Sequence, residues 1–189
     1  MIGRRKRRPA ARVLPTVGPR RLWQPQPMER RRPIGNADER TVLTGWLDWQ
    51  RQTVHVKCAG LGDTKAHAAP LPTSPAMSIA GLVSHLTSVE RDWFEGSFLG
   101  SVDVLSADGG GWDVSGQSIT QLLRNYSRQC SRSQQILAEH SLDELEAYAP
   151  PGLELVSLRW IVTHLIEETG RHLGHLDLLR EMADGSRGQ

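Results

Sequence analysis

The segment from Ser157 to Gly185 constrains the fold most, because it reads as one long amphipathic helix. On a helical wheel with Glu168 as origin and about 100° per residue, its leucine and isoleucine side chains form one apolar stripe. His172 falls inside that stripe and Glu168 lies at its edge. Ser157 is a suitable N-cap residue, and Gly185 is placed to end the helix. The segment therefore predicts a helix that turns a carboxylate and an imidazole towards a core.

Glu168 and His172 are four positions apart, so their side chains share one helix face and can chelate one ion. A carboxylate that faces a core needs a compensating charge, which a divalent metal ion would supply. The residues alone leave a plainer alternative, in which Glu168 pairs with Arg171 or with a protonated His172. His164 and His175 lie on the flanks of the stripe. Either could complete a closed four-ligand zinc site, support a ligand from outside or contact a substrate.

Three further segments have helical periodicity, and none has convincing strand character. Helices are predicted over about 38–59, 78–98 and 118–140, with connectors at 60–76, 99–116 and 141–156. The inward face of the first helix is expected to comprise Leu43, Trp46, Trp49 or Gln50, Thr53 and Val56. The pattern predicts an all-α four-helix bundle of the up-down kind, with connectors long enough to allow another topology. The Gly-rich segment 99–116 suits either the rim of an active site or simple disorder.

His85 lies beside the apolar stripe of the second predicted helix, and Glu90 follows it on the same helix. A single His in such a place is usually a surface residue or a core residue with a hydrogen-bond partner. Glu90 is a candidate hydrogen-bond partner for a metal ligand and is not itself expected to bind the metal. Cys58 and Cys130 lack the spacing of a metal site, and Cys130 is predicted to be a small core residue.

The charge of the chain is unevenly distributed. Residues 1–36 hold eleven of the 23 basic residues and one of the 21 acidic residues, which leaves 12 basic against 20 acidic residues, or −8, beyond them. The first 36 residues predict a disordered Arg/Pro-rich tail. This tail is either a basic arm for nucleic acid or acidic lipid, or the result of a start placed too early, with Met28 as the natural one. The acidic body, over about 37–185, argues against nucleic-acid binding. No segment predicts a membrane span or a secretion signal, so a cytoplasmic protein is expected.

Three segments resemble a known family in their order and spacing: ERTVLTGWLDWQRQTV, GLVSHLTSVERDWF and VSLRWIVTHLIEETGRHLGHLDLLRE. They are similar to the actinobacterial "mini-circle protein" branch of the DinB-like superfamily. That superfamily also includes the YfiT-like metal-dependent hydrolases and mycothiol-dependent maleylpyruvate isomerase. The likeness covers about residues 37–185. It implies a four-helix bundle that binds one divalent metal through a His of the second helix and two residues of the last helix.

Position by position, the resemblance implies that His85, Glu168 and His172 are the metal ligands. Glu168 stands where many members have His, although the maleylpyruvate isomerase branch has Glu there. Zinc or nickel is the expected metal. His175 takes the place of a Gln that many members have, and Gln50 stands where close relatives often have His.

The resemblance also implies a thiol-dependent S-transferase of the mycothiol type. Its partners would be a small-molecule thiol and an electrophilic substrate. Two alternatives stay open: a metal-dependent hydrolase, and a non-catalytic, metal-stabilised bundle associated with stress. Exposed helix faces would also permit a homodimer.

Overall fold

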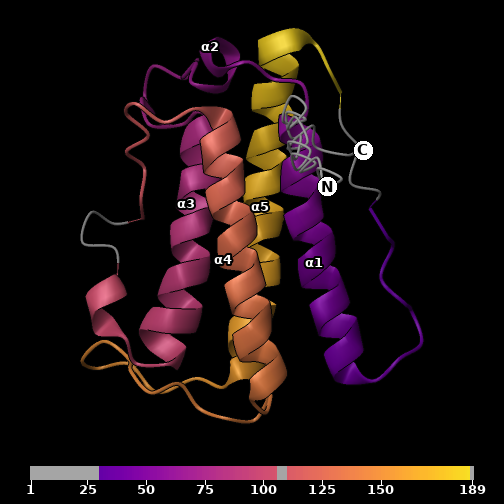
Figure 1. Ribbon diagram of the computed structural model, residues 1–189, viewed down its shortest axis with the longest axis vertical. Coiled ribbons are helices and arrows are strands. Elements are labelled where there is room, and N and C mark those ends of the chain that lie inside the picture. The colour runs from indigo at the N-terminus through magenta and orange to yellow at the C-terminus, as the bar shows by residue number, and fades with distance from the viewer. Residues whose placement is uncertain (1–29, 106–109, 188–189) are drawn as a thin grey trace, which may run out of the picture.

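A computed structural model of the chain describes residues 30–105 and 110–187. Within these ranges all regular structure is helical, apart from one isolated β-bridge between Leu145 and Ser157. The four long helices, shown in Figure 1, are α1 (Glu39–Cys58), α3 (Ile79–Arg91), α4 (Ile119–Glu139) and α5 (Leu158–Asp184). The predicted all-α four-helix bundle is confirmed. None of the helices in these ranges has the length and apolar character needed to cross a membrane.

Most of the predicted tail and the alternative start at Met28 fall on residues 1–29, which lie outside the described ranges. Arg30 is described and already contacts the bundle. Its guanidinium carbon lies 4.4 Å from the ring centroid of Trp49, and its Nη1 donates to the Thr53 hydroxyl at 3.2 Å. Contacts with the bundle therefore begin before residue 37, where the sequence placed the start of the folded body.

The helix ends follow local capping chemistry. Asp38, Ser78, Ser118 and Ser157 each accept a hydrogen bond from a backbone N–H in the first turn of the helix that follows. Gly185 ends α5 in the left-handed conformation, with φ at 78°. Because these caps depend on short-range sequence, the predicted helix ends agree with the structure to within about two residues.

Three short helices were not predicted as separate elements. They are α2 (Asp63–Ala66), η1 (Asp92–Phe98) and η2 (Val102–Val104). The helix η1 is a π-helix that continues α3 without a break. It therefore lies inside the single helix that the sequence predicted over 78–98.

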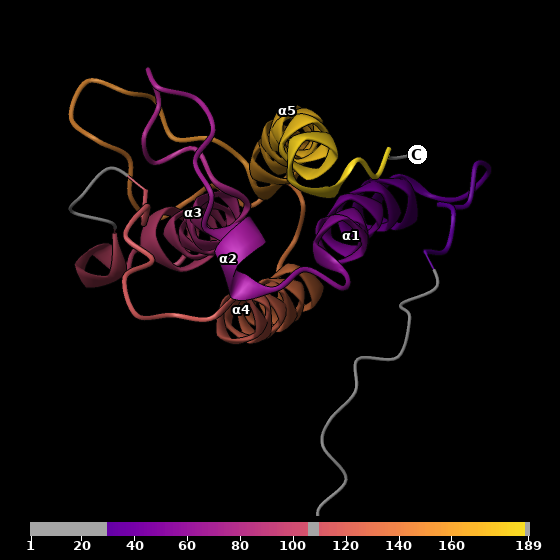
Figure 2. The same ribbon diagram turned by 90° about the horizontal axis from the view of Figure 1, so that it is seen from above.

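The directions of the helices differ from a simple up-down bundle. In Figure 1, α1 and α5 run in one direction and α3 and α4 run in the other, so α3 and α4 are parallel neighbours. Seen from above, the four helices occupy the corners of a quadrilateral, with α1 opposite α3 and α4 opposite α5 (Figure 2). A parallel pair requires a long connection, which the segment between η1 and α4 supplies.

The inward face predicted for α1 is wrong in part. Trp46 and Val56 are 44% and 40% exposed, whereas Leu47 and Val54 are fully buried. Arg51 and Lys57, which a hydrophobic pattern places outside, are also buried. Lys57 forms an ion pair with Asp177 of α5, and Arg51 forms one with Glu90 of α3. Specific carboxylate partners thus rotate α1 away from the orientation that apolar periodicity alone predicts.

Arg51 of α1 and Glu90 of α3 form a buried ion pair across the centre of the bundle. The Nε and Nη2 atoms of Arg51 donate to the two carboxylate oxygens of Glu90, each at 2.6 Å. Arg51 is 4% exposed and Glu90 is 2% exposed. Burial by itself lowers the pKa of Arg51, but the charge and hydrogen bonds of Glu90 raise it well above its ordinary value. Arg51 therefore stays ionised, and its pair with Glu90 links the diagonal helices.

Candidate metal centre

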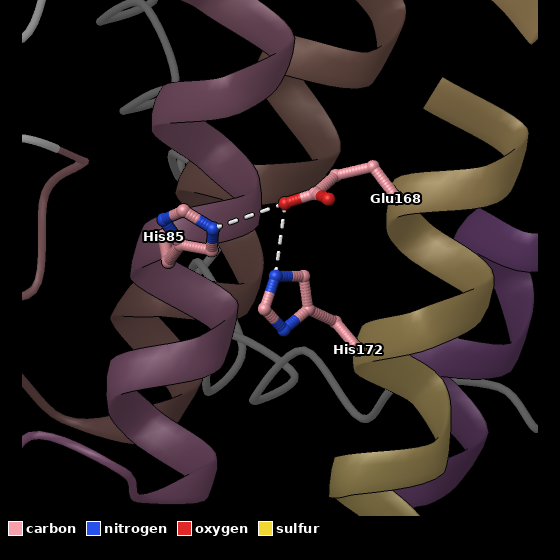
Figure 3. A group of neighbouring side chains, drawn as sticks. All are labelled: His85, Glu168 and His172. Atoms are coloured by element: carbon pink, nitrogen blue, oxygen red, sulfur yellow. Dashed lines mark hydrogen bonds and ion pairs between the residues drawn. The ribbon is translucent and has the colours of Figure 1, made fainter. Parts of the chain in front are cut away.

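Three side chains from α3 and α5 meet between these two helices (Figure 3). One ligand atom each from His85, Glu168 and His172 can be chosen so that all three lie within 4.8 Å of one another. Glu168 Oε1 lies 2.9 Å from His172 Nε2 and 3.5 Å from His85 Nε2. Glu168 and His172 are each 8% exposed. The structure therefore brings together the three residues that the resemblance singled out.

This arrangement fits a divalent metal ion. Ligand atoms held about 2.1 Å from one zinc ion lie roughly 3–4 Å from each other, close to the two separations measured to Glu168 Oε1. Two imidazoles and one carboxylate are a donor set suited to zinc, nickel and similar ions. The imidazoles of His85 and His172 meet edge to face, with centroids 4.8 Å apart, so their Nε2 atoms approach Glu168 from different directions.

The orientation of His85 is set by the segment that precedes α4. His85 Nδ1 lies 2.9 Å from the carbonyl oxygen of Gly110, which can only accept a hydrogen bond. Nδ1 must therefore carry the proton, which leaves the Nε2 lone pair free to face Glu168 in the neutral ring. The indole of Trp112 stacks on the imidazole at 4.3 Å and 12°. A backbone carbonyl that holds the outer nitrogen of a His is typical of metal-binding histidines.

The extra residues suggested by the sequence have separate locations. His175 Nδ1 lies 3.3 Å from His172 Nδ1, on the side of the ring away from Glu168. His164 instead stacks on Trp160, outside the group of three. The carboxylate of Glu90 is directed to Arg51 of α1, not to His85.

Gln50, the other departure noted from the sequence, faces α5 beside Gly170. Its Nε2 atom lies 3.0 Å from the place that a Cβ at Gly170 would occupy. Gln50 thus approaches α5 from α1, whereas His85 approaches α5 from α3.

The charges around Glu168 favour the protonation states that a metal site needs. Burial raises the pKa of the Glu168 carboxyl, but the hydrogen bond from Arg171 and the nearby His172 lower it more, so the net pKa is below its ordinary value. Burial lowers the pKa of His172, and Glu168 offsets this only in part. At neutral pH the site thus presents a carboxylate and a neutral imidazole.

Sequence reasoning missed Gly110 and Trp112 as parts of the site. Both belong to the Gly-rich segment that was interpreted only as a rim or a disordered loop. The available signal was weak: consecutive glycines allow backbone to approach another element closely, and a Trp follows them directly.

Neither cysteine of the chain is a reactive thiol. Cys58 and Cys130 are free and buried, as predicted for Cys130. Burial raises the pKa of the Cys58 thiol to about 12, although the charge of Arg180 opposes this. Burial also raises the pKa of Cys130, and the charge of Glu90 adds to the effect. At neutral pH both side chains are protonated, and a thiolate nucleophile would have to come from outside the chain.

The family model for Mycothiol-S-transferase matches residues 42–185, whereas a comparison with curated proteins returns no match. The matched range contains His85, Glu168 and His172, together with Gly110 and Trp112. This family lies within the DinB/YfiT-like superfamily that the sequence resembles. Because the match extends over well more than half of the 189 residues, the chain belongs to the mycothiol S-transferase family.

Proposed function

We propose that this protein joins a small-molecule thiol of the mycothiol type, through its sulfur, to a carbon of an electrophilic substrate, at a divalent metal held by His85, Glu168 and His172. The thiol loses its proton, the new C–S bond forms, and the electrophile releases its leaving group. The observation that carries the proposal is the convergence of these three side chains, from two distant helices, within a mycothiol S-transferase family member. Zinc or nickel is the metal that we propose.

When bound, the ion supplies a positive charge that lowers the pKa of a coordinated thiol, so that the thiolate forms at neutral pH. The protein's part is to hold that site in one arrangement. His85 presents Nε2 because Gly110 holds Nδ1, and Glu168 adds the negative charge. His175 contacts the outer nitrogen of His172 and would fix the orientation of that ring.

Arg171 and Trp112 complete the surroundings. Arg171 donates to Glu168 Oε2, which leaves Oε1 turned towards the two imidazoles. Trp112 covers one face of His85 and keeps water from that side of the ring. Both cysteines are buried and protonated, so the chain supplies no reactive sulfur of its own. The residues around the metal site would bind and orient an external thiol instead.

A metal-dependent hydrolase could use the same ligands with water in place of the thiol. Family membership favours the transferase, and no feature of the described residues favours hydrolysis over it. A non-catalytic, metal-stabilised bundle is the remaining alternative, and activity measurements separate it from both enzymes.

The test uses the full chain reconstituted with Co²⁺, whose visible spectrum reports changes in its ligands. Saturating mycothiol should change that spectrum and should be consumed with 1-chloro-2,4-dinitrobenzene as the electrophile. His172→Ala should lose both effects, whereas His164→Ala, a His of the same helix outside the site, should keep them. An unchanged cobalt spectrum at saturating mycothiol, with no consumption above the rate of His172→Ala, would exclude the proposed transferase.

A further inference from the structure

A cavity of about 480 Å³ is lined by η1, the 141–156 connector and the start of α5. These elements meet at the lower end of the bundle in Figure 1. None of His85, Glu168 and His172 lines the cavity. Trp160 precedes Glu168 by about two turns of α5, which is roughly 12 Å along the axis. The cavity therefore lies apart from the candidate metal centre.

Two tryptophans form an aromatic wall of this cavity. The rings of Trp93 and Trp160 are tilted by 51°, with centroids 5.4 Å apart. His164 supports them from behind, since it stacks on Trp160 at 20° and meets Trp93 edge to face. Trp160 is 46% exposed, so part of the indole is free to contact a ligand. Indole faces attract cations as well as apolar groups.

Glu146 supplies a buried carboxylate oxygen with no partner. The residue is 5% exposed and contributes to the wall of the cavity. Its Oε1 accepts a hydrogen bond from the Val156 backbone N–H at 3.0 Å, which fixes the side chain. Its Oε2 is buried without any hydrogen-bond partner in the part of the chain that the structure describes. An unpaired buried oxygen of this kind costs free energy, and a positive charge held next to it in the cavity would offset part of that cost.

The polar lining of the cavity has one sign. Asp92 and Glu154 join Glu146 in the wall, and no Lys, Arg or His of residues 30–105 and 110–187 lines the cavity. Arg91 lies next to Asp92, with its Nη2 3.4 Å from Asp92 Oδ1. The remaining lining is mostly apolar side chains of the connector and of α5. Three carboxylates beside two indoles favour a positively charged ligand with an apolar part.

We propose that this cavity binds a protonated organic amine carried on an aromatic or aliphatic body. The ammonium would lie beside the carboxylates of Glu146 and Asp92, while the body packs against Trp93 and Trp160. The amine-binding site does not depend on the transferase proposal, because no metal ligand takes part in it.

Calorimetric titration of the full chain with phenethylammonium and with 2-phenylethanol tests the charge requirement. The two probes share one aromatic body and differ in the ammonium group. Phenethylammonium should bind about tenfold more tightly, or better, in low salt at neutral pH. Equal affinity for the two probes, or no binding of either, would overturn the proposal.

Glu146→Gln tests the carboxylate, since the amide oxygen can still accept from Val156. It should remove the preference for phenethylammonium, whereas Glu144→Gln, an exposed Glu of the same connector, should keep it. Trp160→Leu should weaken the binding of both probes. This variant tests the cavity even if Glu146→Gln folds poorly. His172→Ala should bind phenethylammonium as the unmodified chain does. Unchanged ammonium preference in a folded Glu146→Gln variant would contradict the assigned role.

Discussion

His85 Nε2 lies 3.5 Å from Glu168 Oε1, and this contact joins α3 to the middle of α5. The contact adds a third candidate ligand, from a second helix, to a two-residue pattern on one helix. Each of the three side chains also contacts a further residue that orients it. His85 contacts Gly110, Glu168 contacts Arg171 and His172 contacts His175.

Loss of a ligand should remove the metal. His172→Ala should abolish stoichiometric metal, and His85→Ala should weaken binding strongly, because two remaining protein ligands hold a divalent ion poorly. Elemental analysis of the purified proteins measures this, with His164→Ala as the control that keeps full metal. Full metal content in His172→Ala would refute the ligand assignment.

A side chain at position 110 should disturb His85. A Cβ on Gly110 would lie 2.7 Å from His85 Nδ1, so Gly110→Ala should lower metal affinity about 10- to 100-fold, as loss of an outer contact to a ligand does. Gly116 also has a positive φ, of 72°, but nothing lies within 4 Å of its added Cβ. Gly116→Ala thus adds a side chain at a positive φ without the clash, although 72° strains an alanine less than the 127° of Gly110 does. Competition with a chelating dye should give this variant unchanged affinity. Equal losses in both variants would assign the effect to strain alone.

Removing one partner of the buried Arg51–Glu90 ion pair should lower the free energy of unfolding more than removing both partners. Glu90→Gln leaves the Arg51 guanidinium buried beside a neutral group and should lower the free energy of unfolding by about 3–5 kcal/mol. Replacing both partners, with Arg51→Met and Glu90→Leu together, should recover most of that loss. Urea unfolding followed by circular dichroism measures both variants. Glu39→Gln, in the exposed pair with Arg159, should cause a much smaller change.

The buried thiols should make stability depend on alkaline pH. The pKa of Cys58 rises from 9.0 to about 12 on folding, so the folded chain keeps a proton that the unfolded chain releases. This contribution is complete below pH 9 and is lost as pH rises from about 9 to 12. Thermal unfolding across that range should show the decline, which Cys58→Ala should reduce. At pH 8, iodoacetamide should label neither Cys58 nor Cys130 before unfolding, and rapid labelling of the folded chain would contradict their burial.

The apolar patterns of α3, α4 and α5 predict helices whose ends the caps Ser78, Ser118 and Ser157 confirm. Helical periodicity and capping are local properties, so they can be read over a few turns. The orientation of α1 could not be predicted in the same way. Arg51 and Lys57 are buried because carboxylates on other helices face them, and those partners are distant in sequence.

For the site, the sequence by itself determined that Glu168 and His172 share one helix face, because a spacing of four residues has one outcome in an α-helix. The family resemblance added His85, but only tertiary structure decided that its ring reaches Glu168. That approach depends on α3 packing beside α5, and on Gly110 and Trp112 returning to hold the imidazole. The amine cavity likewise exists only in the folded chain. Glu146, Trp93 and Trp160 come from three elements, and no local spacing relates residues that meet through packing.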